Sequence, residues 1–273
     1  MNLFEYFFTN KAYLPADLPG RLFSPLHIAV MIILTVAVPL VAFLLRKMDK
    51  KKMKILFIVL WAVMVVAEGA KITWESLTNP NGFEVTGILP LYICSIFMYV
   101  MPFAIWGVEK SISRRTACAF LCTLNLIGGF INFIYPSNVL SSYSVISFAG
   151  LHTLFYHATM VFVALLMLFS KYYDYKNIKD GFLAVIPLLI VSIPANVINF
   201  VYNCSYMFFR GGFPFSLISD HLPEWLWIII LYLAYALIPF LFYLPYYIYK
   251  KTKKESEFDK STNKILKIIK SEI

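Results

Sequence analysis

Residues 88–106 read ILPLYICSIFMYVMPFAIW, an apolar stretch without a charged side chain. A helix needs about 20 apolar residues to cross the hydrocarbon core of a bilayer. The stretch therefore predicts a membrane-spanning helix that begins at Ile88 and ends at Trp106. Cys94 is then expected about one turn inside the outer end of this helix, and the other candidate functional residues are placed relative to its thiol.

The whole chain has the composition of a membrane protein. Of its 273 residues, 60% are hydrophobic and only 14% are charged. Further apolar stretches of spanning length lie at 25–45, 55–77, 116–135, 146–169, 181–202 and 225–249. The predicted fold class is all-α, a polytopic membrane helical bundle with about seven transmembrane helices.

The basic residues predict how this bundle is oriented. If the loop of residues 46–54 lies inside, only Lys11, Arg21 and Arg210 of the 24 Lys and Arg residues fall outside, and Lys71 lies within a span. The positive-inside rule then places the N-terminus outside and the C-terminus inside. We expect a multi-pass protein of the cell membrane. Its net charge of +9 is expected to favour contact of the basic residues with the lipid bilayer, and no nucleic-acid partner is expected.

Three parts are predicted along the chain. Residues 1–24 mix aromatic residues with turn formers and are expected to form an extracytoplasmic interfacial segment, without a removable signal peptide. Residues 25–249 form the seven-helix transmembrane domain. Residues 250–273 form a basic cytoplasmic tail, either an amphipathic helix on the inner leaflet or a solvated segment.

Polar side chains within the predicted spans gather toward the outer side. Cys94, His152 and His157 lie at compatible depths in their helices. Polar groups are costly in hydrocarbon unless they pair or line a wet cavity, so we expect a polar chamber that opens outward. The side chains expected to bind substrate there are His27, Glu68, Lys71, Glu75, Asn125, Asn196, Asn199, Asn203 and Tyr206.

The spacing of three charged residues in one span leaves several roles open. Glu68, Lys71 and Glu75 stand at i, i+3 and i+7, so they share a helix face and can neutralise one another. Such a face is a structural ladder of ion pairs, a site for a lipid headgroup, or an ion path.

A thiol beside an imidazole predicts acyl transfer. The thiolate attacks an ester carbonyl, holds the acyl group as a thioester and passes it on to an alcohol or to water. Asn196, Asn199 and Asn203 are candidate donors to the oxyanion. A chamber open to the outer leaflet favours a membrane phospholipid or lysolipid as substrate. No metal or other cofactor is predicted, because the sequence has no Cys/His spacing typical of zinc sites.

Four features of the sequence resemble one known family. They are His27 at the head of the first span, Leu89–Cys94, Leu151–His157 and Asn196–Phe208. Together they resemble the YwaF family of bacterial membrane proteins, which is related to the transmembrane protein 164 acyltransferase.

The resemblance implies residue roles at this site. It implies Cys94 as the acyl-accepting nucleophile and His157 as its base. Helix depth fits His152 slightly better, so both histidines remain candidates, with His157 preferred. The family usually has His at the position of Tyr92 and an acidic residue at that of Ser95.

Three other functions remain open from the sequence. A lipid ester hydrolase would use the same site with water as the acceptor. A transporter would use the Glu68, Lys71 and Glu75 face, but transport paths place polar residues on both sides of the midplane, whereas here they gather on one. A receptor or a non-catalytic lipid-binding protein would not need the Cys94 thiol.

Overall fold

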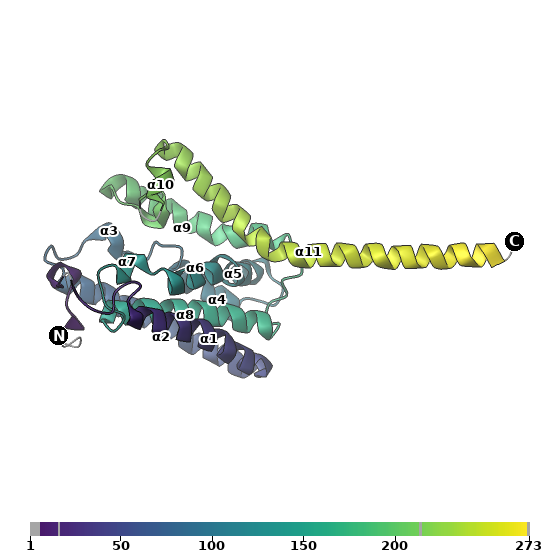
Figure 1. Cartoon of the computed structure of the whole chain (residues 1–273), viewed down its shortest axis with the longest axis horizontal. Helices are drawn as coiled ribbons and strands as arrows, with labels where there is room; N and C mark the ends of the chain where they lie inside the picture. The colour runs from purple at the N-terminus through teal and green to yellow at the C-terminus, as the bar shows by residue number, and fades with distance from the viewer. Residues whose placement is uncertain (1–5, 16, 213–214, 272–273) are drawn as a thin grey trace.

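The computed structural model describes residues 6–15, 17–212 and 215–271, and all regular structure in these residues is helical. The helices lie side by side in one elongated bundle (Figure 1). The all-α prediction is confirmed.

Six helical stretches in the described residues are long and apolar enough to cross a membrane. They correspond to α1 (Pro25–Leu44) with a short extension, α2 (Lys50–Thr78), the run α5 (Ile112–Cys122), α6 (Leu124–Ile134) and α7 (Ser137–Leu140), α8 (Phe148–Phe169), α9 (Asp180–Tyr202) and the first part of α11 (Glu224–Ser271). A seventh apolar helix, α4 (Ile96–Trp106), has 11 residues. Two further helices of four residues each are α3 (Val85–Ile88) and α10 (Ser216–Ser219).

The predicted helix over residues 88–106 is wrong in its first part. Helix α4 begins at Ile96, and residues 89–95 are irregular. Pro90 explains the break, because proline disfavours helical torsions in the residue before it, and Leu89 is extended at φ −66° and ψ 142°. Cys94 therefore lies in a turn that precedes the helix and not one turn inside it.

The predicted span over residues 116–135 is divided near its middle. Thr123 takes the non-helical torsions φ −124° and ψ −91°, which separate α5 from α6. Its hydroxyl donates to the Ala119 carbonyl oxygen at 2.7 Å, so the side chain satisfies a carbonyl at the end of α5.

The centre of the bundle is formed by the α5–α7 run and α8. In their most apolar windows, 67% and 61% of the residues are buried, against 6% in the window that covers α1. Gly129 of α6 lets the two central helices meet closely, since a Cβ atom there would stand 2.6 Å from Cγ2 of Val161 in α8. The outer helices thus pack around a tight central pair.

A buried polar cluster joins four segments at one end of the bundle. Asp180 at the start of α9 is 2% exposed and forms an ion pair with Arg115 of α5. The Tyr173 hydroxyl donates to the other carboxylate oxygen of Asp180 at 2.8 Å and lies 2.7 Å from the Tyr243 hydroxyl of α11. The cluster holds α5, α9, α11 and the α8–α9 connection together.

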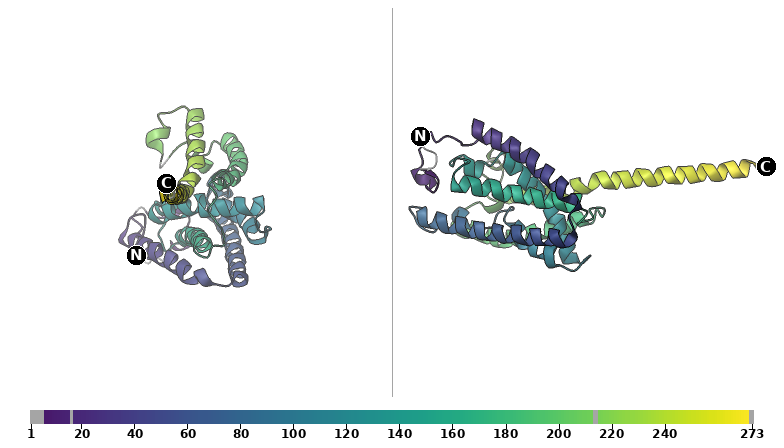
Figure 2. Two further views of the ribbon diagram at one scale, coloured as in Figure 1. Left: turned by 90° about the vertical axis from the view of Figure 1, so that its right-hand side faces the viewer. Right: turned by 90° about the horizontal axis from the view of Figure 1, so that it is seen from below.

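Helix α11 continues past the bundle as far as Ser271 (Figures 1 and 2). Figure 1 shows the helix changing direction as it leaves the bundle, and α11 contains two prolines, Pro239 and Pro245, a residue type that bends helices. Residues 250–271 are thus helical in continuity with the last span, and their placement on the inner leaflet stays a prediction.

We predict that Asp180→Asn lowers the stability of the protein by about 1–3 kcal/mol, because it removes the charge that pairs with Arg115 in a buried site. Thermal unfolding in detergent measures the change. Asp174→Asn is the matched control, since Asp174 forms an exposed ion pair with Lys176. Equal unfolding midpoints for the two variants would contradict a stabilising role for the cluster.

Candidate functional site

The irregular segment of residues 89–95 is fixed by a tyrosine from a distant loop. The Tyr206 hydroxyl accepts a hydrogen bond from the Leu89 backbone N–H at 3.0 Å and donates one to the Val85 carbonyl oxygen at 2.6 Å. Tyr206 is 1% exposed, and burial raises the pKa of its hydroxyl, which keeps the donated proton in place. One side chain thus satisfies two backbone groups where the helical pattern is lost.

Two more tyrosines bind the same segment. The Tyr99 hydroxyl donates to the Pro90 carbonyl oxygen at 2.8 Å, and the Tyr156 hydroxyl of α8 donates to the Cys94 carbonyl oxygen at 3.5 Å. Cys94 is a partly buried residue, whereas Cys118 and Cys122 are 2% exposed. The segment therefore holds Cys94 on a backbone that is fixed from three sides.

Asn199 holds Tyr206 in turn. Its side-chain oxygen accepts from the Tyr206 N–H at 2.6 Å, and its side-chain nitrogen donates to the Tyr206 carbonyl oxygen at 3.0 Å. Asn203 ends α9 in the left-handed region at φ 51°, which turns the chain back toward Asn199. Tyr206 thus supports the backbone of the Cys94 segment, and Asn199 and Asn203 support Tyr206.

Glu68 contacts two other side chains that the sequence predicts at the site, Lys71 and His152. One carboxylate oxygen lies 3.0 Å from Lys71 Nζ, and the other lies 3.2 Å from His152 Nε2 of α8. His152 Nε2 has no hydrogen-bond partner among the described residues, so the second contact is an ion pair when His152 is protonated. The side chains of Glu68 and His152 are each 9% exposed. Glu75, on the same helix, contributes no ion pair within the described residues.

His157 has a different environment. Its Nδ1 lies 2.7 Å from the Thr153 carbonyl oxygen, and because a carbonyl only accepts, Nδ1 carries the proton. Nε2 is then the proton-accepting nitrogen, and it has no hydrogen-bond partner among the described residues. His157 itself is 5% exposed.

Tyr156 connects the three predicted catalytic residues. Its ring centroid lies 5.7 Å from that of His152 and 5.8 Å from that of His157, and its hydroxyl contacts the Cys94 backbone. Glu68 and Lys71 lie close enough to Cys94 for their charges to act on its thiol. In the part of the chain that the structure describes, neither histidine hydrogen-bonds to the Cys94 thiol. Sequence reasoning missed Tyr156, although it stands four residues after His152 on the same helix face.

Three other residues that were predicted to bind substrate instead form hydrogen bonds within the bundle. His27 accepts a hydrogen bond from the Phe23 N–H at 3.0 Å near the start of α1. Asn125 of α6 donates to the Met160 carbonyl oxygen of α8 at 3.2 Å, and Asn196 donates to the Tyr232 hydroxyl at 3.0 Å. The two asparagines join helices, His27 bonds to the chain just before α1, and none of these hydrogen bonds reaches the Cys94 segment.

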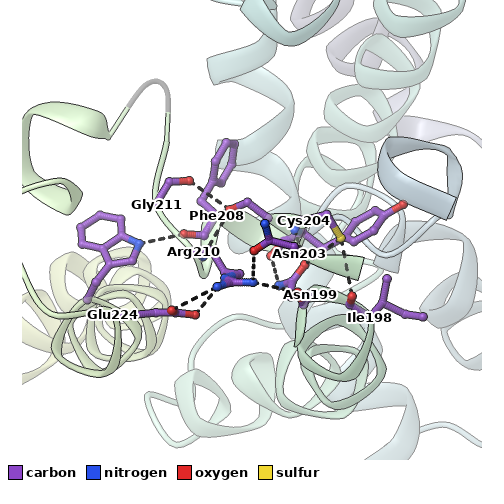
Figure 3. Close-up of polar contacts among 11 residues, drawn as sticks. Ile198, Asn199, Asn203, Cys204, Phe208, Arg210, Gly211 and Glu224 are labelled. Atoms are coloured by element: carbon purple, nitrogen blue, oxygen red, sulfur yellow. Dashed lines mark hydrogen bonds and ion pairs between the residues drawn. The ribbon is translucent and has the colours of Figure 1, made fainter. Parts of the chain in front are cut away.

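A cavity of about 480 Å³ lies beside the loop that carries Tyr206. Arg210 lines it, and Figure 3 shows this side chain between Glu224 on one side and Asn199 and Asn203 on the other. The residues that line the cavity are Asn203, Cys204, Ser205, Arg210, Gly211, Gly212, Ser219, Asp220, Leu222, Glu224 and Trp227. Of these, sequence reasoning assigned a role only to Asn203.

Comparison with known proteins places this arrangement in a family. The model of the TMEM164 family matches residues 22–244, which include every helix from α1 to α10 and the bundle part of α11. No curated protein and no solved structure matches the chain. The narrower likeness to the YwaF family stays a prediction. Because the matched region is well over half of the 273 residues, the chain belongs to the TMEM164 family.

Proposed function

We propose that this membrane protein is an acyltransferase that moves a fatty acyl group from a phospholipid through a thioester on Cys94. The observation that carries the proposal is the position of Cys94. Its thiol belongs to a fixed irregular segment, within reach of the charges of Glu68 and Lys71 and beside the tyrosine that contacts both histidines. A purely structural cysteine needs neither the irregular segment nor these neighbours.

The reaction has two halves. In the first, the Cys94 thiol gives its proton to a histidine and Sγ bonds to the ester carbonyl carbon. The carbon–oxygen ester bond then breaks, and the histidine returns the proton to the departing lysophospholipid oxygen. In the second half, the hydroxyl of an acceptor alcohol attacks the thioester. Its proton passes through the histidine to the departing Cys94 sulfur, which restores the thiol.

The contacts favour His152 as the base. A base that becomes positively charged is stabilised by a carboxylate, and Glu68 lies 3.2 Å from His152 Nε2. Lys71, on the other carboxylate oxygen, fixes Glu68 in position. His157 has no carboxylate in contact among the described residues, although the family resemblance implies it as the base. We therefore assign the proton transfer to His152 and a supporting position to His157.

A hydrolase would share every step up to the thioester. Water in place of the alcohol then gives a free fatty acid. The two activities differ only in the acceptor, so measuring both transferred acyl chains and free fatty acid in one assay separates them.

We predict that the protein in phospholipid membranes takes up label from a phospholipid with a radioactive acyl chain, and that hydroxylamine removes this label. Cys94→Ala abolishes the label because the thioester cannot form. Cys118→Ala is the control, since Cys118 is buried in the core. If Cys94→Ala carries as much label as the wild type, the proposed nucleophile is wrong.

We predict that His152→Gln slows labelling about 10²–10⁴-fold, the usual contribution of a general base. His157→Gln is expected to slow it less than about tenfold, because the carboxylate that would stabilise a positively charged base contacts His152 and, among the described residues, none contacts His157. Single-turnover labelling rates in the two variants decide between the histidines. A larger loss in His157→Gln would return the base to His157.

We predict that Tyr206→Phe lowers the labelling rate, because it frees the backbone at Leu89 and Val85 that positions Cys94. The unpaired N–H also costs about 1–3 kcal/mol of stability. Tyr232→Phe is the matched control, since the Tyr232 hydroxyl joins Asn196 and Ser192 without contacting the Cys94 segment. Equal labelling rates for the two variants at equal folded fractions would show that the Tyr206 contact does not serve catalysis.

A further inference from the structure

The cavity around Arg210 lies at the end of the bundle that carries the Cys94 segment. It is open, and its lining residues lie between the end of α9 and the start of α11. Tyr206, in the same connection, holds Leu89 and Val85. Figure 1 shows α3 and α10 at this same end. The distribution of basic residues predicts that this is the outer end, at the level of lipid headgroups.

Arg210 is held in a fixed orientation. Nε and Nη2 face the two carboxylate oxygens of Glu224 at 3.0 and 3.4 Å, and Nη1 donates to Asn203 Oδ1 at 2.6 Å and to the Asn199 carbonyl oxygen at 3.2 Å. A guanidinium has five N–H donors, so these four contacts leave one for a ligand oxygen. The side chain is 31% exposed and thus reachable from the cavity.

The partner of Arg210 is easily displaced. The Glu224 side chain is 53% exposed, and exposed ion pairs contribute little to stability. A phosphate can therefore take two N–H donors of Arg210 at small cost, in the paired geometry that guanidinium groups favour.

Hydrogen bonds already order the described residues on the rim of the cavity. The Ser205 hydroxyl accepts a hydrogen bond from the backbone N–H of Arg210 at 3.2 Å and donates one to the Gly211 carbonyl oxygen at 3.0 Å. The Gly212 N–H donates to the Ser219 hydroxyl at 3.2 Å, and that hydroxyl donates to Asp220 at 3.0 Å. Binding to such a site loses little conformational entropy.

The charges of the lining select a type of ligand. Two carboxylates, Asp220 and Glu224, oppose one guanidinium, so a ligand with only negative charge is repelled by the surplus. A ligand with a phosphate and an ammonium group satisfies both signs. Asp220 is exposed, and its carboxylate has oxygen lone pairs left for an ammonium beyond the bond from Ser219.

We infer that this cavity binds the headgroup of a zwitterionic phospholipid, with the phosphate on Arg210 and the ammonium at Asp220. The inference deepens the proposed function and rests on it, because it names the headgroup of the lipid whose ester bond reaches Cys94. The cavity lies next to Tyr206, the residue that fixes the segment before Cys94, since Cys204 and Ser205 line the cavity and Tyr206 follows them in the chain.

The test measures lipid binding apart from acyl transfer. Full-length Cys94→Ala protein in detergent is titrated with dihexanoyl phosphatidylethanolamine and with dihexanoyl phosphatidylglycerol, which has the phosphate but no ammonium. We expect Arg210→Gln to weaken binding of both lipids by about tenfold or more, the usual effect of losing a charged hydrogen bond. We expect Asp220→Asn to weaken only the phosphatidylethanolamine complex and so to reduce the preference for it.

Control variants and ligands make each result decisive. Lys11→Gln removes a positive charge on the predicted outer side away from the cavity and should leave both affinities unchanged. If Arg210→Gln does not fold, Asp220→Asn carries the test at an exposed position. Glycerophosphoethanolamine and inorganic phosphate are the soluble ligands, and binding of either as tightly as the lipid would overturn the assignment to a lipid headgroup.

The outcomes separate this inference from the proposed function. Unchanged lipid affinity in folded Arg210→Gln, or an unchanged lipid preference in Asp220→Asn, overturns the headgroup site even if Cys94 becomes labelled. Loss of phosphatidylethanolamine binding in Arg210→Gln supports the site even if the wild type never becomes labelled on Cys94. In that case the acyltransferase proposal alone fails.

Discussion

Backbone groups that leave a helix inside a membrane must find partners within the protein, because hydrocarbon offers none. Pro90 imposes this requirement at the centre of the candidate site, since the chain cannot continue α3 into α4 through it. The hydroxyls of Tyr99, Tyr156 and Tyr206 meet the requirement from three different parts of the chain. The position of the thiol therefore depends on packing between distant parts of the chain at this end of the bundle.

The residue that fixes the Cys94 segment is itself fixed by another residue. Asn199 holds Tyr206 by both of its backbone groups, and Tyr206 holds the segment before Cys94. The Asn199 carbonyl oxygen also accepts from Arg210, so the same helix end contacts the proposed headgroup cavity. A lipid with its headgroup at Arg210 would lie against the chain that fixes the thiol. In the proposed mechanism, the headgroup and the thiol are thus positioned through the same helix end at Asn199.

The helices were predictable because hydropathy depends on local composition alone. Six predicted spans agree with long apolar helices, and the seventh is shortened where Pro90 stands. The proline was visible in the sequence, but the apolar pattern around it favoured a longer helix. The break at Thr123 has no proline or glycine to indicate it, and it depends on packing inside the central pair of helices.

The site was predictable in its residue types and less so in its contacts. The helical spacing that joins Glu68 to Lys71 is local, so it could be derived from the sequence. The approach of Glu68 to His152 joins α2 to α8, and the pairing of Arg210 with Glu224 crosses a loop, so neither follows from spacing. Asn125 and Asn196 resembled substrate ligands because buried amides serve both roles, and only their partners show that they join helices.

Tyr206 also sets how freely this part of the sequence can vary. One phenol oxygen accepts from Leu89 and donates to Val85, in a position that is almost fully buried. Phenylalanine offers neither function, and tryptophan and lysine only donate. A serine or threonine hydroxyl could do both but is too short to reach across the space that the ring fills. Tyrosine thus supplies both functions from a single oxygen at the end of a long side chain, which ties the surrounding loop to the backbone at Leu89 and Val85.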